Sequence, residues 1–92
     1  MTIALITGTR PEIIKMFPLM KIFDSRLIDY TYIHTGQHYD QELFIKFIEE
    51  FGVRKPDYHI TMKEANPIDQ VSIMLREVGA IINKLQPSLV LI

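Results

Sequence analysis

The residues best suited to bind an anion lie near the start of the chain. Gly8 follows a short apolar run and lets the backbone come close to a ligand. Arg10 and Lys15 bring positive charge to the start of a predicted helix, whose free N–H groups and dipole also favour a phosphate. If Pro11 is the first helical residue, Arg10 takes the capping position and has no acceptor for those N–H groups. The spacing therefore predicts an anion site at Gly8, Arg10 and Lys15.

The same segment has a structural interpretation. Thr9 is a residue type that caps helices, and a cap there would leave Arg10 and Lys15 solvated. Glu12 suits the first turn of a helix and can pair with Lys15 three residues later. Neither the G-x-G-x-x-G nor the G-x-x-x-x-G-K-[ST] phosphate-binding motif is present. Spacing alone leaves both interpretations open.

A second polar segment, residues 36–40, contains Gln37 and His38. Imidazole is the usual acid–base group near neutral pH, so His38 is a candidate for proton transfer or substrate contact. In the alternative interpretation Asp40 caps the next helix and His38 bonds to the backbone. No set of residues stands at a metal-ligand spacing, and we expect no metal.

Alternating strand and helix patterns must position these loops. Strands are predicted at residues 3–7, 30–35, 58–62 and 89–92, and helices at 11–23, from a cap at Asp40 to Phe51, and from a cap at Asn66 to Gln86. Pro18 is expected to bend the first helix. His34 and His59 fall within or near strands, which predicts structural roles. The order βαβαβαβ predicts an α/β fold, a parallel Rossmann-like sheet with helices on both faces and strand order 3-2-1-4. Ligands bind outside the carboxyl ends of such strands, where both loops lie.

Composition narrows the class of protein. A chain of 92 residues and 10.8 kDa forms one domain at most, and its 48% hydrophobic content is that of a folded protein. Ten basic and eleven acidic residues give a net charge of −1, which argues against a nucleic-acid partner. The chain has no cysteine, so thiolate chemistry is excluded. No apolar run is long enough to span a bilayer and no signal-peptide pattern is present, so we expect no membrane partner and a cytoplasmic location.

Two features predict that these residues are the front part of a larger protein. Strand 89–92 would lie beside the first strand, near the middle of a complete sheet, and natural domains seldom end on a bare apolar strand edge. Helix 11–23 is apolar around nearly its whole circumference, which calls for cover on more than one side.

The loop residues together resemble the non-hydrolysing UDP-N-acetylglucosamine 2-epimerases. The similar segments are 8–15 (GTRPEIIK), 35–38 (TGQH), 56–58 (PDY) and 87–92 (PSLVLI). The resemblance covers essentially all 92 residues, and the octapeptide 8–15 is its most specific part.

The resemblance implies an isomerase that interconverts UDP-GlcNAc and UDP-ManNAc for polysaccharide biosynthesis. Family members are cytoplasmic homodimers with two Rossmann-like domains facing across a cleft, the GT-B arrangement. Residues 1–92 would be the N-terminal part of the first domain. The implied reaction is anti elimination of UDP and its re-addition to the other face, with no metal or nicotinamide cofactor. Arg10 and Lys15 match positions that contact the UDP-sugar substrate.

The family's catalytic aspartate, glutamates and histidine lie in and beyond a His-Gly-Asp loop that follows the fourth strand. The catalytic residues are therefore unknown here and expected beyond Ile92, and the 92-residue chain alone is predicted to be inactive. Gln37 and His38 match a loop that in many bacterial members contacts an activating second UDP-GlcNAc, but Tyr39 replaces the basic residue there. Two alternatives are a free-standing nucleotide-binding or interaction module and a fragment of a GT-B glycosyltransferase.

Overall fold

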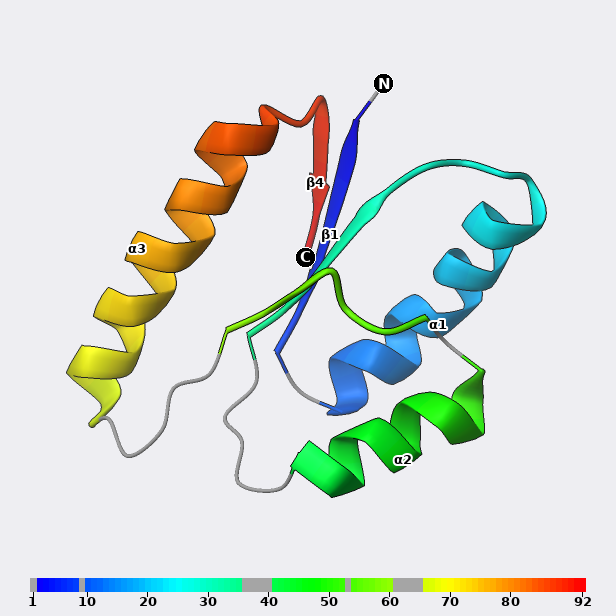
Figure 1. Cartoon of the computed structure of the whole chain (residues 1–92), viewed down its shortest axis with the longest axis horizontal. Helices are drawn as coiled ribbons and strands as arrows, with labels where there is room; N and C mark the ends of the chain where they lie inside the picture. The colour runs from blue at the N-terminus through cyan, green and yellow to red at the C-terminus, as the bar shows by residue number, and fades with distance from the viewer. Residues whose placement is uncertain (1, 9, 36–40, 53, 61–65) are drawn as a thin grey trace.

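The computed structural model describes residues 2–8, 10–35, 41–52, 54–60 and 66–92 (Figure 1). Its elements are β1 (Ile3–Thr7), α1 (Arg10–Ser25), β2 (Thr31–His34), α2 (Gln41–Phe51), β3 (Tyr58–His59), α3 (Pro67–Leu85) and β4 (Leu89–Leu91). The strands form one sheet in the order β3-β2-β1-β4, and all neighbouring pairs are parallel. The predicted α/β class and the 3-2-1-4 order are confirmed.

Helices cover both faces of the sheet (Figure 1). Alternation along β1 and β2 sends successive side chains to opposite faces. The face toward α1 and α2 holds the larger core, formed by Ile3, Leu5, Met20, Phe23, Tyr30, Tyr32 and Ile48. The opposite face packs on α3 through Ile33, Ile60, Ile73, Met74, Val78 and Ile81. The better-packed face is thus the one between the sheet and α1 with α2.

α3 has the ends that the sequence predicts. The Asn66 side chain accepts a hydrogen bond from the Asp69 N–H at 2.8 Å, and Pro67 takes the first helical position. Gln86 closes the helix in the left-handed conformation, at φ 48°. No side chain of α3 is fully buried, so the helix covers its sheet face only partly.

The bounds of α1 differ from the prediction. The helix begins at Arg10 rather than Pro11 and continues through Pro18 to Ser25. Pro11 is therefore the second helical residue, and the capping position moves to residue 9, which lies outside the described residues. The apolar residues of α1 are buried on one side of the helix only: Ile13 is buried, whereas Ile14 is about half exposed.

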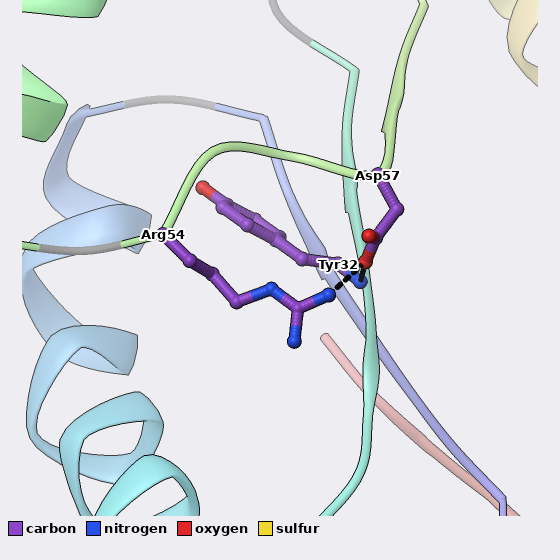
Figure 2. Close-up of polar contacts among 3 residues, drawn as sticks. All are labelled: Tyr32, Arg54 and Asp57. Carbon is purple, nitrogen blue, oxygen red and sulfur yellow. Dashed lines mark hydrogen bonds and ion pairs between the residues drawn. The ribbon is translucent and has the colours of Figure 1, made fainter.

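A polar clamp holds the amino ends of β2 and β3 (Figure 2). The Asp57 carboxylate accepts hydrogen bonds from the Tyr32 backbone N–H at 2.8 Å and from Arg54 at 2.5 Å. The Arg54 guanidinium also lies over the Tyr30 ring, 4.4 Å from its centroid. The Tyr30 hydroxyl is buried with no hydrogen-bond partner among the described residues, and burial, reinforced by the Asp24 charge, raises its pKa to about 12. This end of the sheet is clamped and has a structural role.

Candidate functional site

The carboxyl ends of β1 and β2 lie side by side. Thr7, the last residue of β1, is in register with His34, the last residue of β2. One residue further on, Thr35 donates from its backbone N–H to the Thr7 carbonyl at 2.8 Å. The segments that follow Thr7 and Thr35 therefore leave the sheet at one edge, as the predicted strand order requires.

A buried polar chain joins the two strand ends. The Thr7 hydroxyl lies 3.0 Å from the Tyr32 hydroxyl and 2.8 Å from Nδ1 of His34. Thr7, Tyr32 and His34 are all buried, at 1%, 0% and 5% exposure. Burial raises the pKa of the Tyr32 phenol, although the hydrogen bond to Thr7 lowers it. The sequence interpretation assigned no site role to Thr7 or Tyr32; the available signal was a threonine ending an apolar strand.

A ring contact between His34 and His59 joins these hydrogen-bonded residues to β3. Their rings lie 5.3 Å apart with planes tilted by 52°, and the Ile60 N–H donates to the His34 carbonyl at 2.9 Å. Both histidines belong to the sheet, as their sequence positions predict. The structure adds that His34 makes its polar contact at the edge where ligands bind in this class of fold.

Gly8 and Glu12 close the turn between β1 and α1. The Gly8 N–H donates to the Glu12 carboxylate at 2.5 Å. A Cβ on Gly8 would lie 3.1 Å from that carboxylate oxygen and 3.2 Å from the Thr35 hydroxyl, so glycine permits this close approach. The turn thereby brings a carboxylate and a hydroxyl against the backbone that follows β1.

This contact adds a local tie that the sequence argument did not include. Glu12 reaches back along the chain to the Gly8 N–H, which precedes the helix, whereas the cap for the first N–H groups of α1 falls at residue 9, outside the described residues. The signal was present in the sequence: a threonine followed three residues later by a glutamate, at 9–12, is the pattern of a capping box. Here the carboxylate bonds one residue before the usual target.

The structure places only part of the predicted anion site. Gly8 is at the turn and Lys15 is exposed on α1, one turn beyond Glu12. Arg10 is the first helical residue, and its side chain lies outside the described part. Four further predicted positions also lie outside the described residues: Thr9, Gln37, His38 and Asp40. The Arg10–Lys15 site, the Gln37 and His38 contacts and the Asp40 cap therefore stay predictions.

The described residues contain neither a metal-binding cluster nor a membrane-spanning helix. No three histidine, aspartate or glutamate side chains come together in an arrangement that could hold a metal ion. No helix among the same residues has the length and apolarity needed to cross a membrane.

The parallel sheet and the glycine turn after β1 define a Rossmann-like α/β unit with its loops at the ligand-binding edge. Comparison with known families makes the assignment specific. The model of the UDP-N-acetylglucosamine 2-epimerase family matches residues 21–92, and the chain belongs to this family.

Relatives match nearly the whole chain. It is 38% identical to the UDP-N-acetylglucosamine 2-epimerase of Methanococcus maripaludis, over 98% of this chain and 24% of the relative. It is 33% identical to the UDP-2,3-diacetamido-2,3-dideoxy-D-glucuronate 2-epimerase of Pseudomonas aeruginosa, over 100% of this chain and 26% of that enzyme. The crystal structure of Methanocaldococcus jannaschii UDP-GlcNAc 2-epimerase in complex with UDP-GlcNAc and UDP superposes with a TM-score of 0.85 at 34% identity, covering 98% of this chain and 25% of that one. The chain thus spans about a quarter of the length of these relatives.

Proposed function

We propose that this chain forms the first part of an enzyme that interconverts UDP-GlcNAc and UDP-ManNAc. The observation that carries the proposal is the family match over residues 21–92. The superposition on an epimerase whose complex contains UDP-GlcNAc and UDP supports it. The matches also favour an epimerase over the glycosyltransferase alternative, because the most similar relatives carry epimerase names.

The proposed chemistry is an elimination followed by an addition. A base removes the proton on carbon 2 of the sugar, the bond from the anomeric carbon to oxygen breaks, and UDP leaves with the electron pair. The product is 2-acetamidoglucal. UDP then adds back at the anomeric carbon while carbon 2 is protonated on the opposite face, which inverts that centre. Catalysis requires stabilisation of the departing diphosphate as well as proton transfer.

We assign the diphosphate to the edge formed by the turn after β1. Gly8 gives the backbone close access there, and Arg10 and Lys15 would supply positive charge from the first turns of α1. Gln37 and His38 would contribute from the neighbouring segment, which leaves the sheet beside this turn. The groups that transfer protons would lie beyond Ile92, so the 92-residue chain alone is expected to be inactive.

The remaining features of the whole protein follow from the family resemblance. We propose that residues 1–92 belong to the first of two Rossmann-like domains in a GT-B arrangement. The complete enzyme would be a cytoplasmic homodimer that serves polysaccharide biosynthesis and needs no metal or nicotinamide cofactor.

A second candidate substrate is UDP-2,3-diacetamido-2,3-dideoxy-D-glucuronate. The Pseudomonas aeruginosa enzyme named for this substrate is 33% identical to the chain, close to the 34–38% of the two methanococcal relatives named for UDP-GlcNAc. Both substrates would undergo the same chemistry at carbon 2, so the distinction concerns groups at carbons 3 and 6 of the sugar.

The test incubates the full-length protein with each of the two nucleotide sugars in D₂O and follows the products by NMR. We expect a UDP-ManNAc signal from UDP-GlcNAc, with deuterium at carbon 2 because the proton is exchanged with solvent. Turnover of the diacetamido uronate alone would select the second substrate. Sugar transfer to an added acceptor, with no epimer formed, would contradict both.

A further inference from the structure

Thr7 has more polar contacts at the ligand-binding edge than its place in a hydrophobic strand suggests. Its carbonyl accepts from the Thr35 N–H, and its hydroxyl contacts both the Tyr32 phenol and the His34 imidazole. Thr7 directly precedes Gly8, and His34 directly precedes Thr35. The Thr7 side chain thus links the last residues of β1 and β2, the two strands that precede the candidate binding segments.

The direction of the hydrogen bonds in this chain follows from what each group can donate. Burial raises the pKa of the Tyr32 phenol, so Tyr32 keeps its proton and needs an acceptor. Thr7 is the partner that the structure gives to this hydroxyl. When Tyr32 donates to Thr7, the Thr7 proton is free to go to Nδ1 of His34, and the phenol, the hydroxyl and Nδ1 each have a partner. In this arrangement the hydrogen bonds run from Tyr32 through Thr7 to His34.

We propose that Thr7 is a positioning residue for the UDP-sugar site, and this inference rests on the proposed function. Its hydroxyl holds Tyr32 and His34 in one arrangement and thereby sets the spacing between the Gly8 turn and Thr35, whose hydroxyl lies against that turn. Without the hydroxyl, the Tyr32 phenol loses the partner that the structure gives it, and the His34 imidazole loses one hydrogen bond. A buried phenol without a partner is costly, so Tyr32 would shift toward water at the sheet edge and His34 would lose its link to Thr7. That shift would displace the backbone that holds the diphosphate.

The experiment measures UDP binding by calorimetry on the full-length protein, at a temperature well below the unfolding midpoint of every variant. Thr7→Val keeps the β-branched shape and the backbone pairing but removes the hydroxyl. We expect its Kd for UDP to rise about tenfold, because small displacements of binding groups have large effects on such sites. Thr7→Ser keeps the hydroxyl and should bind like the parent. If Thr7→Val only lowers the unfolding midpoint and binds UDP as the parent does, the hydroxyl serves folding alone and the inference is wrong.

Tyr32 of β2 and Tyr30, which directly precedes β2, lie in the same core and provide a matched pair that does not depend on Thr7→Val folding. Tyr32→Phe removes the first donor of the chain, whereas Tyr30→Phe removes a buried hydroxyl with no partner among the described residues. We expect weaker UDP binding in Tyr32→Phe and parental binding in Tyr30→Phe. Equal affinities in the two variants would overturn the positioning role. A parent protein that does not bind UDP would overturn the proposed function and, with it, this inference.

Discussion

The starts of α1 and α3 use their polar side chains in different ways. At α3, the neutral side chain of Asn66 accepts from the Asp69 N–H within the first turn. At α1, the charged side chain of Glu12 reaches back beyond the helix to the N–H of Gly8, directly after β1. The first arrangement closes a helix locally. The second ties a helix to a strand end and places a carboxylate where the fold class binds its ligands.

This difference has a consequence for binding. The start of α3 has a local, uncharged cap, and α3 packs on the opposite face of the sheet from α1. The start of α1 combines one negative charge at Glu12 with the positive charges of Arg10 and Lys15. A diphosphate bound there would meet attraction and repulsion within the first two helical turns. Substitutions at α1 should therefore change both stability and UDP binding, whereas substitutions at α3 should change stability alone.

The largest effect is expected for Arg10→Ala in the full-length protein. Loss of a charged hydrogen-bond donor to the diphosphate should weaken UDP binding by about 1.5–3 kcal/mol. Calorimetry with UDP measures this effect. Arg76→Ala is the matched control, because Arg76 is an exposed arginine of α3. Equal UDP affinity in Arg10→Ala and Arg76→Ala would remove Arg10 from the site.

Gly8→Ala should destabilise the protein by about 1–2 kcal/mol, because the added methyl group would crowd Glu12 and Thr35. Gly79→Ala in α3 should do the opposite. A Cβ at Gly79 would meet nothing within 4 Å, and alanine is the better helix former by roughly 0.8–1 kcal/mol. Urea unfolding of both variants measures the difference. A Gly8→Ala protein as stable as the parent would show that the turn has room for a side chain.

Asn66→Ala should cost about 1 kcal/mol of stability, since the Asp69 N–H loses its acceptor. UDP affinity should stay parental because α3 packs on the opposite face of the sheet from α1. Asn66→Asp keeps an acceptor and should unfold at nearly the parental urea concentration. A change in UDP affinity in Asn66→Ala would contradict the expectation that substitutions at the start of α3 change stability alone.

Local patterns predicted the arrangement of elements well. The apolar run of β1, the aromatic and β-branched residues of β2, the Asn66-Pro67 start of α3 and the βαβ order were sufficient for the parallel sheet and its strand order. These features depend on near neighbours and on general rules of handedness, which are readable in one sequence. The start of α1 was misplaced by one residue, because proline is accommodated at several positions in the first turn.

The candidate site was less predictable because it depends on register. The contact between Thr7 and His34 exists only because β1 and β2 pair with these two residues opposite each other. No local pattern states that pairing. The Gly8–Glu12 bond is local and its pattern was visible, but the position of the helix start decided which N–H the carboxylate reached.

Glu12→Gln gives the smallest expected effect and tests the comparison most directly. Glutamine can still accept from the Gly8 N–H but carries no charge, so stability should fall by only about 0.3–1 kcal/mol through the weaker interaction with the helix dipole. UDP binding should strengthen by a similar amount, because a negative charge beside the diphosphate has been removed, and the gain should shrink as salt is added.

Asp69→Asn is the matched control, since it neutralises the first-turn acid of α3. It should lose comparable stability and bind UDP like the parent. Calorimetry at two salt concentrations separates the cases, and identical UDP affinities in Glu12→Gln and Asp69→Asn would mean that the α1 carboxylate does not face the ligand.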